Sequence, residues 1–279
     1  MQPGRASKTA LGVAIRRAAH QLIDRPPVLD DPIAVRLVGS GYPRQMERAM
    51  HSVGRDFRCF MAARSRYVED RLAEAVAEGV AQYVVLGAGL DTFAWRNPFP
   101  SLCVFEVDFP ATQEWKRKML AEADLPLPPN LTFVPLDFEH HTLSGGLAEA
   151  RFDVRRPAFF GWLGVVPYLT LSAFRATLKT IARLPAGSGV SFDYAVAPES
   201  LSPLGRVAFH ALAGRVAAAG EPFQLFFSPH QLEGELHGAG FQRFEQVGSE
   251  QINERYFKNR ADGLKLSDLG LGKLVAAWV

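Results

Sequence analysis

The sequence predicts a doubly wound, Rossmann-like α/β fold with a seven-stranded, mostly parallel sheet, and three observations lead to this prediction. Short, unbroken apolar runs recur along the chain. Helical patterns lie between several of these runs, which is typical of a parallel sheet covered on both faces. The first run, residues 82–86, passes directly into the turn Gly87-Ala88-Gly89, which resembles a strand leading into a nucleotide-binding turn.

The first 60 residues show helical patterns. Four apolar residues fall on one face at helical spacing, namely Leu11, Ile15, Ala18 and Leu22. Residues 24–32 break the pattern because consecutive prolines cannot continue a helix. A further helix is expected over residues 64–79, where Gly79 is suited to end it.

Seven apolar runs after this helix are candidate strands. They span residues 82–89, 101–108, 131–138, 157–164, 189–196, 242–248 and 273–279. Helical patterns cover residues 111–123, 171–184 and 200–220. Ser228, Pro229 and Gln231 form the signature of a capping box that begins one more helix.

These patterns predict one domain over residues 1–279. We expect a helical N-terminal lid (1–60), a cofactor-binding core (61–199), a helical insertion (200–228), and C-terminal strands with a substrate loop (229–279). The inserted helices are expected to belong to the lid. The oligomeric state is left open.

Bulk composition describes an ordinary globular protein. Hydrophobic residues make up 48% and charged residues 22% of the chain. A net charge of +2 is too small to indicate a nucleic acid or a membrane surface as a partner. The apolar runs are too short to span a bilayer. Cys59 and Cys103 are expected to be buried and reduced, which together with the absence of a secretion signal predicts the cytoplasm.

The glycine turn itself discriminates between ligands. A dinucleotide-binding turn has a third glycine three residues after the second, where helix and strand pack closely. Here that position is Thr92, a poor substitute. A turn of the form G-x-G-x-D instead suits S-adenosylmethionine, because the glycines let the chain pass flat against the ligand and Asp91 can face its ammonium group.

The next two strands also end in suitable side chains. Glu106 and Asp108 follow Gly87 at about the distance where a carboxylate binds ribose hydroxyls. Asp108, as a strand-end acid, is expected outside the core. Asp137 and Phe138 could bind adenine by a hydrogen bond and by stacking. NAD shares the ribose and the adenine, so these residues alone do not decide the ligand.

The combined motifs resemble the leucine carboxyl methyltransferase family of class I S-adenosylmethionine-dependent enzymes. The resemblance rests on residues 86–96 and 105–110, and it extends to 63–70, 135–139, 162–170 and, more weakly, 253–260. It implies that Arg64 binds the carboxylate of the methionine moiety, a contact for which arginine is well shaped. It also implies that Gly87, Ala88 and Gly89 form the turn at the cofactor.

The resemblance assigns the remaining cofactor contacts and shows one departure. Asp108, with Glu106 nearby, would hold the ribose, and Asp137 with Phe138 the adenine. The family often has a glutamate before the glycine of the fourth strand. In this chain the position is Leu163, before Gly164, while Tyr168 is retained. The acid contact at that point is therefore missing or comes from elsewhere.

The sequence shows no Ser-His-Asp constellation and no metal cluster. His140 and His141 are interpreted as a solvated turn. Arg255 and Tyr256 lie in a C-terminal segment that the family places near the substrate, where their side chains could hold an acceptor. The expected reaction is O-methylation of a small molecule or peptide at a carboxylate, which is already ionised at neutral pH. Tyr168, Tyr256 and His141 would be the candidate bases for a phenol or alcohol.

Two alternatives remain at this point. An NAD-dependent dehydrogenase is disfavoured by Thr92. A non-catalytic S-adenosylmethionine-binding protein is favoured only by Leu163. A nucleic acid substrate is not expected, because residues 97–100 resemble the motif of base-modifying amino-methyltransferases only weakly and the chain has no basic stripe.

Overall fold

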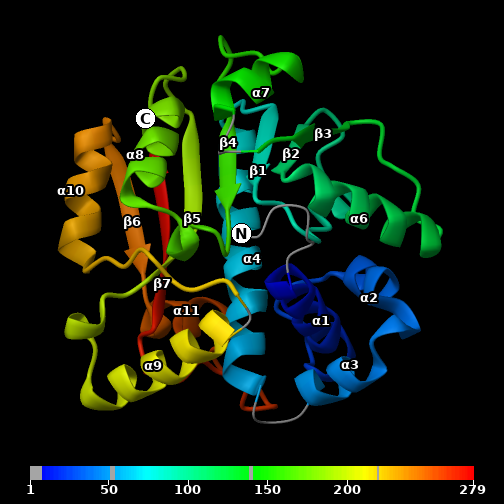
Figure 1. The fold of residues 1–279 in the computed structure, drawn as a ribbon, viewed down its shortest axis with the longest axis vertical. Helices are drawn as coiled ribbons and strands as arrows, with labels where there is room; N and C mark the ends of the chain where they lie inside the picture. The colour runs from blue at the N-terminus through cyan, green and yellow to red at the C-terminus, as the bar shows by residue number, and fades with distance from the viewer. Residues whose placement is uncertain (1–7, 51–53, 138–140, 219) are drawn as a thin grey trace.

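A computed structural model describes residues 8–50, 54–137, 141–218 and 220–279, and its ribbon is drawn in Figure 1. Seven strands form one sheet in the order β3-β2-β1-β4-β5-β7-β6. The strands are β1 (Gln82–Leu86), β2 (Cys103–Asp108), β3 (Leu131–Pro135), β4 (Phe159–Trp162), β5 (Gly189–Ala195), β6 (Arg243–Val247) and β7 (Gly272–Trp278). All seven coincide with predicted apolar runs, so the predicted fold class is confirmed.

One strand, β7, runs against the direction of the other six. β1 to β5 run parallel, and β7 runs antiparallel to both β5 and β6. The chain order reverses between β1 and β4, because β2 and β3 lie on one side of β1 while β4 and the later strands lie on the other. Ligands of open α/β sheets bind outside the carboxyl ends of the strands at such a switch point.

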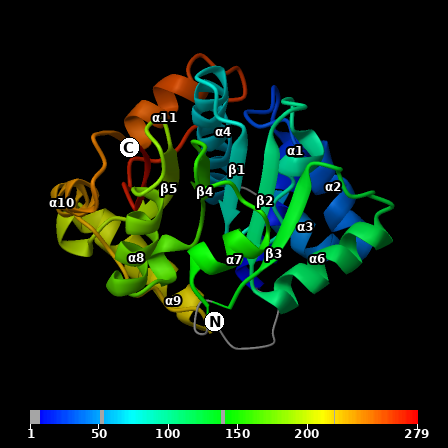
Figure 2. The ribbon, with the colours of Figure 1, turned by 90° about the horizontal axis from the view of Figure 1, so that it is seen from above.

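Helices cover both faces of the sheet, as Figure 2 shows from above. The largest apolar cluster joins one face to α7 (Leu143–Glu149), α8 (Leu171–Ile181) and α10 (Pro229–Ala239). The other face packs against α4 (Arg55–Ala77), α5 (Phe93–Arg96) and α11 (Ser249–Tyr256). α6 (Pro110–Glu122) joins a third cluster with the N-terminal helices.

The remaining helices lie beyond the carboxyl ends of the parallel strands, toward which β4 points in Figure 1. They are α1 (Lys8–Ile23), α2 (Pro32–Val38), η1 (Gly39–Gly41), α3 (Pro43–Met50), η3 (Val166–Tyr168), η4 (Pro198–Ser200) and α9 (Pro203–Ala218). α1 contacts α2, α3 and α4, so the N-terminal helices form a compact unit at this edge.

Local predictions hold with three corrections. The capping box of α10 is present, with Ser228 and Gln231 bonding to each other's backbone N–H groups. α4 begins at Arg55, nine residues before the predicted start. Leu22 is exposed rather than part of the apolar face of α1. Cys103 is also exposed, because it is the first residue of β2 and lies before the covered part of the strand, whereas Cys59 is buried; both are free thiols.

Across the described ranges, no helix combines the length and the apolar character that a bilayer-spanning segment needs.

Candidate functional site

The glycine turn lies at the switch point, between the ends of β2 and β4. Gly87 and Gly89 have φ values of +66° and +49°, a region that strains any residue with a side chain. The N–H groups of Gly87 and Ala88 donate to the carbonyl of Val107 at 2.8 and 3.2 Å. A Cβ on Gly87 would lie 2.4 Å from Val165 Cγ2, so only glycine fits this approach.

Asp108 closes the turn from the end of β2. Its Oδ2 accepts the N–H of Gly89 at 2.5 Å, and its Oδ1 accepts the N–H of Phe109 at 2.7 Å. Burial raises the pKa of Asp108, although these two N–H groups act in the opposite direction. The expectation that this strand-end acid lies outside the core is wrong, because the carboxylate must be buried to reach the turn.

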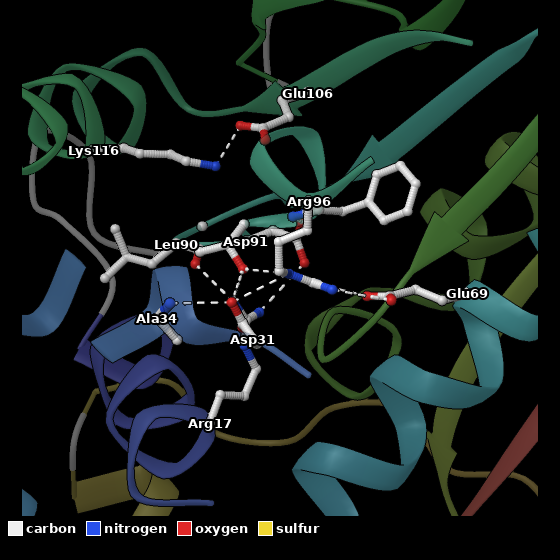
Figure 3. Close-up of polar contacts among 12 residues, drawn as sticks. Arg17, Asp31, Ala34, Glu69, Leu90, Asp91, Arg96, Glu106 and Lys116 are labelled. Carbon is white, nitrogen blue, oxygen red and sulfur yellow. Dashed lines mark hydrogen bonds and ion pairs between the residues drawn. The ribbon is translucent and has the colours of Figure 1, made fainter. Parts of the chain in front are cut away.

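Glu106 lies two residues earlier, on the same face of β2 and deeper in the protein. It is fully buried, and its Oε2 lies 2.5 Å from Lys116 Nζ of α6 (Figure 3). Burial raises the pKa of Glu106 to about 7, although Lys116 lowers it. Its Oε1 has no hydrogen-bond partner within the described residues. Of the two acids that were predicted to hold a ribose, Asp108 is therefore the one that lies at the carboxyl ends of the parallel strands.

Asp91 and Thr92 connect the turn to the N-terminal helices. Asp91 Oδ1 accepts the N–H of Phe93 at 2.7 Å, and Asp91 Oδ2 lies 3.3 Å from Arg17 Nη1. The carboxylate that was predicted to face a cofactor ammonium group thus binds the first residue of α5 and an arginine of α1. Thr92 fills the third glycine position, and its buried hydroxyl accepts from Arg17 at 2.7 Å and donates to Asp31 at 2.7 Å.

Asp31 is the centre of this network, as Figure 3 shows. It caps α2 by accepting the N–H of Ala34 at 3.0 Å, and it lies 2.8 Å from Arg17 Nη2 and 3.2 Å from Arg96 Nε. Burial alone would raise the pKa of Asp31, but Arg17 and Arg96 outweigh it and hold the pKa below its usual range. Arg96 in turn makes a two-point contact with Glu69 of α4, at 2.6 and 3.1 Å.

Arg64 lies on α4, where it faces the ends of β4 and β5. Its Nη1 lies 2.8 Å from Asp193 Oδ2, and both side chains are buried. The other oxygen of Asp193 accepts the N–H of Gly164 at 2.5 Å. Gly164 has a φ of +70°, and a Cβ there would lie 3.1 Å from Arg64 Nη2. Arg64 Nε is buried and has no acceptor within the described residues.

Leu163 packs against the apolar cluster between α4 and β1, so it offers no polar contact at this point. The carboxylate that reaches the turn after β4 belongs instead to Asp193 of β5. An acid contact to this turn therefore exists and comes from the neighbouring strand, although its partners are Gly164 and Arg64.

Of the two residues that were predicted to bind adenine, the structure describes Asp137. The N–H of Leu136 donates to the carbonyl of Asp108 at 2.9 Å, which brings Asp137 to the same edge as Asp108. Asp137 is partly buried. Phe138 and His140 lie outside the described residues.

Tyr168 ends η3, and its ring lies 5.3 Å from that of Phe223, in the segment between α9 and α10. Burial, with the Glu221 carboxylate adding to it, raises the pKa of Tyr168 to about 12. The phenol is therefore protonated at neutral pH and is suited to donate a hydrogen bond rather than to act as a base.

Arg255 and Tyr256 bind acidic side chains of neighbouring elements. Arg255 Nη2 lies 2.9 Å from Glu245 Oε2, and the Tyr256 hydroxyl donates to Asp70 Oδ2 at 2.8 Å. Burial and the Asp70 carboxylate raise the pKa of Tyr256. No hydrogen bond or ion pair within the described residues joins either side chain to Arg64 or to the glycine turn, and their role at the acceptor stays a prediction.

Three charged residues of the site were missed by the sequence reasoning. Arg17 and Asp31 lie in the predicted lid, where Asp31 carries the local signal of a helix cap before Pro32. Asp193 carries a stronger signal, because it is a lone acid inside the apolar run 189–196. A buried charge in such a run needs a partner, which the sequence alone does not identify.

The arrangement fits S-adenosylmethionine. Gly87 and Gly164 both have positive φ, and a side chain at either position would crowd Val165 or Arg64. Arg64 offers a buried N–H without an acceptor, as a ligand with a carboxylate requires. Asp108 and Asp137 lie at the neighbouring strand ends, where a nucleoside would lie. Within the described ranges, no cluster of three or more His, Cys, Asp or Glu side chains could hold a metal ion.

Comparison with known proteins agrees with this interpretation. The family model for leucine carboxyl methyltransferase matches residues 10–182. The chain is 31% identical to the Bacillus subtilis protein named "Putative S-adenosyl-L-methionine-dependent methyltransferase YktD", over 95% of both chains. A Mycobacterium avium protein with the same description apart from the final name is 32% identical, over 71% of this chain and 67% of its own.

Solved structures share the fold at low sequence identity. A DUF574 family protein from Streptomyces avermitilis superposes with a TM-score of 0.53 at 18% identity, covering 94% of this chain and 96% of its own. Magnesium protoporphyrin IX methyltransferase from Synechocystis, solved with bound S-adenosylhomocysteine, has a TM-score of 0.51 at 12% identity, covering 93% and 99%.

Replacing Asp31 with Asn is expected to destabilise the protein, because Arg17 and Arg96 lose their shared buried counter-charge. We expect the free energy of unfolding to fall by roughly 3 kcal/mol, measured by urea unfolding. Asp30→Asn, at the exposed neighbouring position, is the control and should leave the curve unchanged. Superimposable curves for the two variants would contradict the central role of Asp31.

Glu106 predicts a pH dependence of stability. Its ordinary pKa is 4.5, and in the folded protein it is about 7. Between these values the folded chain binds more protons than the unfolded chain, so this group lowers the free energy of unfolding as the pH rises from about 4.5 to about 7. Wild type should therefore lose stability relative to Glu106→Gln over this window, in urea unfolding at a series of pH values. For Glu122→Gln, exposed on α6, the free energy of unfolding should follow that of wild type across the pH series. If the free energy of unfolding of Glu106→Gln also followed wild type, the prediction would be contradicted.

Proposed function

Because the chain belongs to the leucine carboxyl methyltransferase family and is an S-adenosylmethionine-dependent methyltransferase, we propose that it methylates an oxygen atom of a small molecule or peptide, with a carboxylate as the acceptor group. When bound, S-adenosylmethionine supplies an activated methyl group that the acceptor displaces directly. The protein then has to align the two reactants and exclude water. The dehydrogenase alternative has no support from the family.

The cofactor-binding part of the proposal rests on the Arg64 site. Arg64 would bind the methionine carboxylate through the N–H groups that Asp193 leaves free. The glycine turn, with Ala88 between its glycines, would pass along the ligand, and the segment at Leu163 and Gly164 would lie opposite. Asp108 and Asp137, with Phe138, would hold the adenosine. Asp91 would act through the turn, because its own oxygens are taken by Phe93 and Arg17.

The acceptor part rests on Tyr168. Its hydroxyl makes no hydrogen bond within the described residues, and its raised pKa keeps the proton in place at neutral pH. Such a phenol can donate to a carboxylate, which needs no base because its pKa is near ~4. Arg255 and Tyr256, paired with Glu245 and Asp70, are not required in this scheme.

Replacing Arg64 with Ala is expected to weaken the binding of S-adenosylhomocysteine by roughly 1.5–3 kcal/mol, because one charge-assisted contact is lost. Titration calorimetry measures this, after circular dichroism shows that the variant is folded. Arg66→Ala is the matched control, since Arg66 lies two residues away on α4 and is about half exposed. Equal affinities for wild type and Arg64→Ala would rule out the assignment.

The reaction is tested with methyl-labelled S-adenosylmethionine and a panel of acids, phenols and amines. A methyl ester releases its label in base, and this is the expected product. Base-stable label on oxygen would keep O-methylation but reject the carboxylate, and label on nitrogen or carbon only would reject the proposal. Tyr168→Phe should raise the acceptor KM and leave the affinity for S-adenosylhomocysteine unchanged.

A further inference from the structure

We propose that Asp193 is a positioning residue for cofactor binding, because it fixes the Arg64 guanidinium and the turn after β4 in one mutual arrangement. This inference rests on the proposed role of Arg64 toward the methionine carboxylate. Asp193 itself needs no contact with the cofactor. It acts through two groups, each of which belongs to a different element.

The contacts of Asp193 link three elements that are distant in sequence. Its Oδ2 lies 2.8 Å from Arg64 Nη1 on α4, and its Oδ1 lies 2.5 Å from the N–H of Gly164, which follows β4. The carboxylate is on β5, the strand next to β4. Strand pairing therefore fixes the position of Asp193, and Asp193 in turn fixes the helix side chain and the turn.

The ion pair is incomplete in a way that points to a ligand. Two other low-exposure arginines of the chain make two-point contacts with their acids, Arg58 with Asp24 and Arg96 with Glu69. Arg64 gives Asp193 only Nη1, because the second oxygen of Asp193 is occupied by Gly164. As a result Arg64 keeps a buried Nε–H with no acceptor in the described residues. Buried polar groups are usually satisfied, so this donor is available to a ligand.

The turn and the guanidinium are also in direct contact. A Cβ at Gly164 would lie 3.1 and 3.2 Å from the two terminal nitrogens of Arg64. A side chain at position 164 would therefore crowd the guanidinium, and a shift of Arg64 away from Asp193 would break the ion pair. The negative charge of Asp193 also partly offsets the cost of burying Arg64, which holds the arginine in place before a ligand carboxylate arrives.

Asp193→Asn separates the contact with the Gly164 N–H from the ion pair with Arg64. The amide oxygen can still accept the N–H of Gly164, but the negative charge facing Arg64 is lost and the amide NH2 group repels the guanidinium. The binding partner that reports on Arg64 is S-adenosylhomocysteine, which carries the amino-acid carboxylate. The matched ligand is 5′-methylthioadenosine, which has the same nucleoside but no amino-acid part.

We expect Asp193→Asn to weaken S-adenosylhomocysteine binding roughly tenfold and to leave 5′-methylthioadenosine binding unchanged, both by calorimetry. In an Arg64→Ala background, Asp193→Asn should cause no further loss. Asp24→Asn is the control for breaking a buried arginine–aspartate pair elsewhere, and it should lower the Tm without changing the ratio of the two affinities.

Two outcomes would overturn the inference. One is an unchanged ratio of the two affinities, whether both ligands weaken equally or neither does, and the other is an additive loss in the Arg64→Ala background. Failure of the proposed role of Arg64 has a different signature, since Arg64→Ala would then bind S-adenosylhomocysteine as tightly as wild type does. Failure of the proposed O-methylation changes the labelled product and neither of the two affinities. A lower Tm of Asp193→Asn does not change the interpretation, because the two affinities are measured below the unfolding transition. Asp24→Asn shows what destabilisation alone does to their ratio.

Discussion

The buried carboxylate of Asp31 is the interaction on which the carboxyl edge of the sheet depends. It holds two arginines, one hydroxyl and the first turn of α2, and these groups come from three parts of the chain. A charge in this position is tolerated only because every oxygen is paired. Through Thr92 and Arg17 the same carboxylate fixes the N-terminal helices to the residues that follow the glycine turn. The shape of the turn and the position of the helices above it are therefore not independent.

Local features of the sequence were sufficient for the fold and for part of the site. Apolar runs mark strands because both faces of a parallel sheet are covered, and Gly87 and Gly89 mark the turn because the backbone has positive φ there. The pairs Arg64–Asp193 and Thr92–Asp31 could not be predicted in this way, since their members are 129 and 61 residues apart. Each lone residue offers several partners, and only the packing of strands and helices selects one.

The same reason explains why the partners of the two predicted acceptor residues could not be foreseen. Arg255 and Tyr256 were chosen by their chemistry and by family position, but Glu245 and Asp70 on adjacent elements bind them. Likewise, Glu106 and Asp108 look equivalent in sequence, and only the depth of each along β2 separates a buried pair with Lys116 from a carboxylate at the edge. The sequence names the charged residues, but the depth at which each is buried decides which partner it binds.

The start of α1 has a practical consequence. A Cβ at Gly89 would lie 3.0 Å from that of Ala10, so the first turn of this helix lies directly over the glycine turn. Thr9 donates to Glu221 at 2.6 Å, which joins the same turn of the helix to the segment after α9. The opposite end of the chain pairs beside Ser188, at the amino end of β5 (Figure 1). The first turn of α1 therefore lies at the binding edge, whereas Val279 lies at the opposite end of the strands, so a fluorophore attached at Val279 would be farther from the ligand than one attached to the first turn of α1.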